Sequence, residues 1–180
     1  MKGMLALLIA VPLTLHPSPA AAVGGPSNIV IAVNHTDGRL AIRSNVQLAR
    51  EPGPIAAPKN LALATASCAD CQTIAVAIQL DFATFDAHYV APQNAAVATN
   101  EACTHCTTVA LAYQVFLQVD DPNATAAGIA DDIRSLNAEV RAISTDPNIT
   151  LADAEARIAS AVDRFWTFAV AIDAQRSASE

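Results

Sequence analysis

Three segments of this 180-residue chain share the pattern Pro-x-Asn followed by a short apolar run. They are PSNIVIAVN at 26–34, PKNLALATA at 58–66 and PQNAAVATN at 92–100, so the unit recurs at offsets of 32 and 34 residues. Self-similarity at such a period indicates one supersecondary unit used three times.

A second apolar run follows each of these segments in the sequence, and its large apolar residues recur with a period of two. They are Leu40, Ile42, Val46 and Leu48 in the first unit, Ile74, Val76, Ile78, Leu80 and Phe82 in the second, and Val109, Leu111, Tyr113, Val115 and Leu117 in the third. Period-two alternation is typical of strands. We therefore predict three strand–turn–strand units, paired as antiparallel β-hairpins that form one sheet or a small barrel.

After the turn-like segment 120–123 the apolar period changes from two to about 3.5. One stripe comprises Ile129, Ile133, Leu136, Val140 and Ile143, and a second comprises Leu151, Ile158, Val162, Phe165, Ala169 and Ile172. The short linker TDPN predicts an antiparallel helical hairpin. The fold class is thus α+β in one compact domain, with a β-hairpin repeat region over 23–121 and a helical hairpin over 122–180 packed on it.

The first 22 residues have the organisation of a signal peptide. Lys2 supplies a positive charge, residues 4–15 are mostly apolar, and Ala20-x-Ala22 is a small-residue cleavage site. A retained membrane anchor is the alternative, but Pro12 interrupts the apolar run too early for a span. We expect a secreted or extracytoplasmic protein with no membrane insertion after cleavage.

The charge balance excludes two classes of partner. The chain carries 10 basic and 17 acidic side chains, for a formal net charge of −7, and its basic residues are scattered. A nucleic-acid-binding surface needs clustered cations, and anionic lipid headgroups would be repelled. A protein partner or a second copy of the chain is the remaining expectation.

Two Cys-x-x-Cys motifs, CADC at 68–71 and CTHC at 103–106, stand ahead of the second and third alternating runs. If Leu40, Ile74 and Val109 are taken as equivalent, residues 34–37 of the first unit fall in register with both motifs. The motifs are therefore predicted to form the turns of their units, and the first unit turns without thiols.

Three kinds of chemistry are open to Cys68, Cys71, Cys103 and Cys106. Residues i and i+3 of a turn are close enough for disulfides Cys68–Cys71 and Cys103–Cys106, while neighbouring turns would also allow the crossed pairing Cys68–Cys103 with Cys71–Cys106. An exported protein folds where disulfides persist, which favours disulfides and no cofactor.

Zinc is the alternative cofactor, because two Cys-x-x-Cys pairs on two turns supply the four soft ligands of a tetrahedral site. Thiol redox chemistry is the third possibility. It is disfavoured because each motif opens a strand, whereas thioredoxin-like thiols gain acidity from a helix N-terminus.

The usual enzymatic signatures, such as His-Glu-x-x-His and Gly-x-Ser-x-Gly, are absent from the sequence. Asp81, Asp86 and His88 form the one acid/base cluster, and a solvated loop explains it best. Near the end of the second helix, Phe165, Trp166, Phe168 and Val170 exceed what one partner helix needs, so they are a candidate interaction surface.

The segments NLALATASCADCQTIAVAIQL and NAAVATNEACTHCTTVALAYQVFL resemble a family of small exported bacterial proteins with paired Cys-x-x-Cys hairpins. The same segment occurs in proteins labelled peptide zinc metalloproteases. The resemblance covers about residues 26–119 and implies an extracytoplasmic module of no established activity. It does not imply proteolysis, because the zinc-binding helix motif of those proteases is missing here.

These observations predict an exported, non-catalytic structural or protein-interaction module that is stabilised by turn disulfides and acts at the cell envelope, beside a membrane protease. The alternative is an exported zinc-binding or thiol-redox protein that uses the two cysteine pairs.

Overall fold

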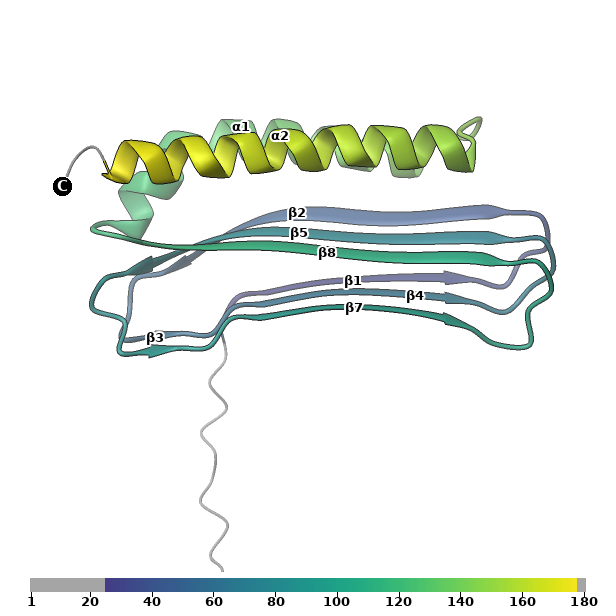
Figure 1. The fold of residues 1–180 in the computed structure, drawn as a ribbon, viewed down its shortest axis with the longest axis horizontal. Helices are drawn as coiled ribbons and strands as arrows, with labels where there is room; N and C mark the ends of the chain where they lie inside the picture. Colours follow the sequence, from purple (N-terminus) through teal and green to yellow (C-terminus); the bar gives the residue numbers. More distant parts are fainter. Residues whose placement is uncertain (1–24, 178–180) are drawn as a thin grey trace, which may run out of the picture.

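The computed structural model describes residues 25–177, so the predicted signal peptide at 1–22 lies outside the described residues. The described chain is a mixed α+β fold in which eight strands precede two helices (Figure 1). The strands are β1 (Ser27–Asn34), β2 (Leu40–Glu51), β3 (Ile55–Ala56), β4 (Lys59–Ala66), β5 (Gln72–Thr84), β6 (Tyr89–Val90), β7 (Gln93–Asn100) and β8 (Thr107–Val119). The helices are α1 (Pro122–Thr145) and α2 (Leu151–Ser177).

The strands form three small sheets, and every pairing in them is parallel. The sheet orders are β1-β4-β7, β2-β5-β8 and β3-β6. The chain therefore winds through three stacked turns and adds one strand to each large sheet per turn, as in a parallel β-solenoid. Figure 1 looks along this stack, so the strands of each sheet lie one behind another.

The prediction of antiparallel hairpins closing into one sheet or a barrel is wrong. The two strands of a unit do not pair with each other; each pairs with its counterpart in the next unit, and the unit's two strands lie in separate layers (Figure 1). Alternating burial is the same for a strand in a hairpin and a strand in a solenoid layer. Periodicity alone therefore could not separate the two arrangements.

The predicted alignment of the first unit is also wrong, by two residues. Ile42, not Leu40, pairs with Ile74, while Ile74 pairs with Val109 as expected. A slip of one residue would turn every side chain to the other face, but a slip of two leaves the apolar face intact. The apolar alternation of these strands therefore could not reveal a shift of two residues.

The helical tail is confirmed as two helices, which cover the face of β2-β5-β8 that points away from β1-β4-β7 (Figure 1). The Asp121 carboxylate caps α1 by accepting from the backbone N–H groups of Asn123 and Ala124. The largest core lies between these helices and the long strands. Its fully buried members include Ile74, Val76, Ile78, Leu80, Phe82, Val140, Ile143, Ala161 and Phe165.

The interior between the two large sheets is narrow and is lined by alanines and one row of asparagines. Asn28 Nδ2 donates to Asn60 Oδ1, and Asn60 Nδ2 donates to Asn94 Oδ1, both at 2.9 Å. The same amides donate across the interior to backbone carbonyls of the opposite sheet, Asn60 to Ala77 and Tyr113. This asparagine ladder joins consecutive turns and also ties the two layers together.

The two ends of the stack differ. At the first turn, α1 covers β2: the Val46 N–H donates to Asn137 Oδ1 at 3.0 Å, and Ser44 Oγ donates to the Val140 carbonyl at 3.0 Å. Within the described chain, β1 and β2 at the first turn and β7 and β8 at the last turn each have one strand partner. The two ends differ because α1 covers β2 and the inward residues of β1 are buried, whereas the inward residues of β7 are exposed. We call the end formed by β7 and β8 the open end.

The ladder predicts a position-dependent cost of removing an asparagine. Asn60→Ala leaves a buried gap and unpaired carbonyls, so the free energy of unfolding should fall by about 3 kcal/mol. The matched control is Asn94→Ala at the exposed end of the same ladder, where water replaces the amide and the loss should be about 1 kcal/mol. Urea unfolding of both variants measures the difference. Equal losses of unfolding free energy would contradict a larger contribution from the buried Asn60.

Candidate functional site

The two cysteine motifs lie in turns that stack along one side of the solenoid, where β4 is joined to β5 and β7 to β8 (Figure 1). Gly38, Asp70 and His105 occupy the same place in the three turns and share a left-handed backbone, with φ of 67°, 53° and 54°. Asp and His tolerate this conformation better than most residues, so the turn geometry persists where glycine is replaced.

The turns continue the pairing of the strands. Gly38 N donates to the Ala69 carbonyl at 2.9 Å, and Asp70 N donates to the Thr104 carbonyl at 2.8 Å. Because Leu40 pairs with Gln72, the cysteine positions correspond to Thr36 and Arg39, not to the predicted 34–37 segment. Asp37 joins the first turn to the second, because its carboxylate accepts from Ala69 N at 2.8 Å.

Cys68 lies at disulfide-bonding distance from Cys71, and Cys103 at the same kind of distance from Cys106. Their Cα atoms are 6.0 Å and 5.9 Å apart, within the usual disulfide range. The Cys68–Cys71 pair is buried, whereas Cys103 and Cys106 are half-buried at the open end of the stack. A dithiol in solution therefore meets the outer pair first.

Stacking brings the two pairs into one cluster. The four Sγ atoms all lie within 4.8 Å of one another, and Cys71 Sγ is 3.3 Å from Cys106 Sγ. In the described chain this is the one group of three or more potential metal ligands. Four thiolates are the donor set of a structural zinc site, so the residues fit zinc once both disulfides are reduced.

In the cysteine turns, His105 Nδ1 lies 3.3 Å from Asp70 Oδ1, and both side chains are largely exposed, so the contact is weak. Both motifs precede strands, so neither motif opens a helix. This arrangement resembles a structural cluster more than a dithiol catalyst.

A second polar cluster lies inside the solenoid, and the sequence prediction missed it. Asp81 is fully buried on β5 instead of lying in a solvated loop with Asp86 and His88, both of which are exposed. The Gln114 amide donates to Asp81 Oδ2 at 2.9 Å and to Gln79 Oε1 at 3.2 Å. Asp81 Oδ1 has no hydrogen-bond partner among the described residues.

Burial raises the pKa of Asp81 from 3.8 to about 7; the Gln114 hydrogen bond opposes this, and the nearby Glu51 carboxylate adds to it. Burial also raises the pKa of Glu51, although its Oε2 accepts from Ala57 N at 2.7 Å. Two buried acids on neighbouring long strands thus favour the protonated form. The stability of the fold should therefore depend on pH.

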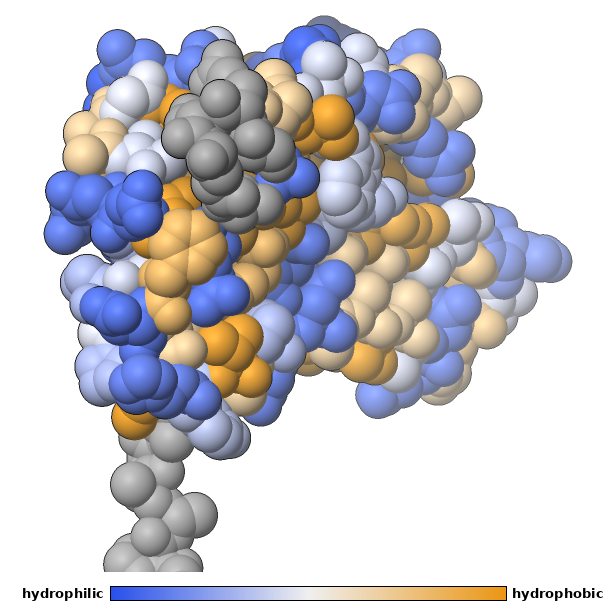
Figure 2. All heavy atoms as spheres, turned by 60° about the vertical axis from the view of Figure 1, so that its left-hand side comes forward, coloured by the Kyte–Doolittle hydropathy of each residue, from blue (hydrophilic) through white to orange (hydrophobic). Residues whose placement is uncertain are grey.

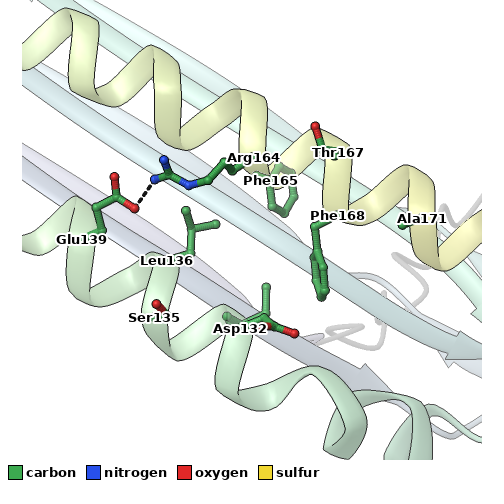
Figure 3. A pocket seen from close by; sticks show the side chains of 10 residues that line it. Asp132, Ser135, Leu136, Glu139, Arg164, Phe165, Thr167, Phe168 and Ala171 are labelled. Carbon is green, nitrogen blue, oxygen red and sulfur yellow. Dashed lines mark hydrogen bonds and ion pairs between the residues drawn. The ribbon is translucent and has the colours of Figure 1, made fainter.

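The predicted aromatic surface on α2 divides between two faces. Phe165 and Phe168 point into a groove of about 410 Å³ between α1 and α2, with Leu136 opposite them and the Arg164–Glu139 ion pair at one end (Figure 3). Trp166 and Val170 do not line this groove and are 42% and 65% exposed. Phe165 itself is fully buried.

An exposed apolar surface lies on the opposite side of the molecule, on β1-β4-β7. Ile29, Ile31 and Val33 are 55%, 52% and 50% exposed, and Val97 on β7 is also exposed. Leu61 and Leu63 between them are half-buried. We call these six residues the outer sheet face.

More apolar side chains are exposed beside β3 and β6, at the end away from the cysteine turns. They are Ile55, Phe85, Tyr89 and Val90. Figure 2 turns this end of the molecule forward and shows apolar residues gathered among polar ones. Neither described helix is both long enough and apolar enough to span a membrane.

Comparison of the chain with protein-family models, curated proteins and solved structures finds no match.

The buried acid predicts that stability depends on pH. Because the pKa of Asp81 is higher in the folded state than its ordinary 3.8, the folded state holds the proton more tightly. The free energy of unfolding should therefore fall as pH rises from about 4 to about 7, by up to about 4 kcal/mol.

Urea unfolding across that pH range measures the effect. Asp81→Asn should remove most of the dependence, and the exposed Asp86→Asn is the matched control that should keep it. A wild-type protein that gains stability between pH 5 and 7 would rule out a protonated buried Asp81.

Proposed function

We propose that this protein is an exported, non-catalytic protein-interaction module, and that the outer sheet face is its binding surface. The observation that supports this is the exposure of apolar side chains on a rigid sheet where alternation normally places polar ones. In β1, the residues that point outward include Ile29, Ile31 and Val33, and each is at least half exposed.

The chemistry of this face favours an apolar protein surface as its partner. Lys59 is the one charged residue in β1, β4 and β7. Thr65 and Thr99 border the apolar residues at one end and hydrogen-bond to each other at 3.1 Å. A neutral apolar centre with a polar border is the composition of a protein interface core and its rim.

The scaffold behind this face suits a binding role. Every second residue of the same strands points into the interior, where Asn28 and Asn60 are held by the asparagine ladder. The outward residues therefore keep fixed positions, and little conformational entropy is lost when a partner binds.

Site-specific photo-crosslinking in the cells that produce the protein tests this proposal. A photoreactive amino acid in place of Ile31 should give a discrete adduct with another protein, whereas the same group in place of Val170 on α2 should not. Adducts at position 170 alone would move the binding surface to the helices. Absence of any adduct at position 31 would contradict the proposal.

Zinc binding is a second candidate function, supported by the clustering of four Sγ atoms within 4.8 Å. In this state Cys68, Cys71, Cys103 and Cys106 would bind one ion as thiolates, which requires both disulfides to be reduced. Zinc would supply folding energy and no catalysis, because four protein ligands leave no open position.

The two states of the cysteines predict different masses and different responses to mutation. Disulfides lower the intact mass by about 4 Da relative to four thiols, and Cys103→Ser with Cys106→Ser should then cost only about 1–2 kcal/mol, because each disulfide closes a short loop. A zinc protein instead gains a metal mass in native spectra and unfolds when that pair is replaced. Intact and native mass spectrometry with thermal melts distinguishes them.

A further inference from the structure

The open end of the stack lacks a layer that the rest of the solenoid has. The inward-facing residues of β4 are Asn60, Ala62, Ala64 and Ala66, and all are buried. Their counterparts one turn later are Asn94, Ala96, Ala98 and Asn100, and all are exposed. A further strand beside β7 would bury these four residues.

The asparagine ladder points the same way. In the first two turns, each amide donates both across the interior and to the asparagine of the next turn. Asn94 Nδ2 donates across the interior to the Ala112 carbonyl at 3.0 Å, but there is no next turn in the described chain. One hydrogen of this amide is therefore directed towards the open edge.

The open edge also carries none of the features that keep sheet edges apart. Natural edge strands are usually protected by charged residues, proline or a covering helix. No charged residue occurs in β7 or β8, and α1 covers the opposite end of the stack at β2. In a chain with a net charge of −7, this uncharged edge lets two copies approach with little charge repulsion.

The inward row of β7 reads Asn-Ala-Ala-Asn at 94, 96, 98 and 100, and it is the same in both directions. The inward rows of β1 (Asn28, Val30, Ala32, Asn34) and β4 (Asn60, Ala62, Ala64, Ala66) are not. A two-fold axis needs such self-complementarity, because each copy presents the same surface to the other.

We propose that two copies of this protein associate through their open ends, with β7 of each copy pairing antiparallel across a two-fold axis at Val97. Each Asn94 then lies opposite Asn100 of the second copy, and each Ala96 opposite Ala98. The unused amide hydrogen of Asn94 gains an acceptor in the Asn100 side-chain oxygen.

The second layer fits the same axis. Asn94 contacts Ala112, and Thr108 Oγ1 donates to Asn100 Oδ1, so the segment 94–100 lies across the interior from 108–112 of β8. The axis through Val97 therefore passes near Ala110. It places Thr108 opposite Ala112 of the second copy, a pair small enough for the strands to approach.

The size of the contact predicts a reversible dimer. A strand of eight residues is about 26 Å long, and two side-chain layers are about 20 Å deep, so the end of the stack offers on the order of 500 Å² per copy. Standard stable interfaces bury about 800 Å² per partner. The dimer should dissociate on dilution.

Cysteine cross-linking tests the geometry directly, because a residue on the axis meets itself. Val97→Cys should form an intermolecular disulfide under mild oxidation, since directly opposed residues of antiparallel strands have Cβ atoms about 5 Å apart. Ile31→Cys is the matched control: Ile31 and Val97 occupy equivalent positions through Leu63, but Ile31 lies on β1 at the opposite end of the sheet, two turns from β7. It should remain monomeric.

The three other results each have a defined meaning. Dimers from both variants would indicate association through the outer sheet face, which would overturn this proposal. Dimers from Ile31→Cys alone would also overturn it. Dimers from neither variant would do the same, while the photo-crosslinking result at position 31 would still decide the proposed function.

Sedimentation velocity over a concentration series provides the second test. The wild-type protein should change from monomer to dimer, and Ala98→Lys should raise the dissociation constant at least about tenfold by adding a charge to the edge. Because Ala98 is exposed in the single chain, this variant should melt like the wild type. A wild-type monomer at every concentration up to about 1 mM would overturn the proposal.

Discussion

The asparagine ladder is the interaction on which the solenoid depends. A narrow interior lined by alanines buries too little apolar surface to hold two sheets at a fixed separation. Asn28 and Asn60 supply directional bonds instead: along the stack to the next asparagine and across it to carbonyls of the opposite sheet. Identical side chains at equivalent positions make each turn a template for the next, and the large apolar core can then form on the outer side of β2-β5-β8.

The main hydrophobic core and the proposed binding surfaces consequently lie in different parts of the molecule. The helices and the long strands bury residues such as Ile74, Phe82 and Phe165, which provide most of the hydrophobic free energy. The short strands β1, β4 and β7 contribute a thin interior and leave their outer side chains in solvent. The two surfaces proposed for binding, the outer sheet face and the open end, therefore lie outside the main core.

Much of the local structure could be predicted from the sequence, and the long-range pairing could not. The apolar period predicted the long strands and both helices, and the turn positions of the two cysteine motifs followed from it. Parallel stacking was missed because alternation describes which side of a strand is buried, not which strand lies beside it. Asp81 was missed because its neighbours Asp86 and His88 belong to a loop, whereas the alternation of β5 continues through residue 84.

The helical hairpin has a consequence for the length of the stack. Two helices side by side span about 20 Å, since each is about 10 Å in diameter, while three strands about 4.8 Å apart occupy about 14 Å. The hairpin thus covers three strands and has no width left for many more. The helical hairpin therefore limits the number of turns. In a chain with further repeats, each added long strand would expose apolar side chains at the positions equivalent to Leu111. Such growth of the solenoid costs free energy unless further helices cover the added strands.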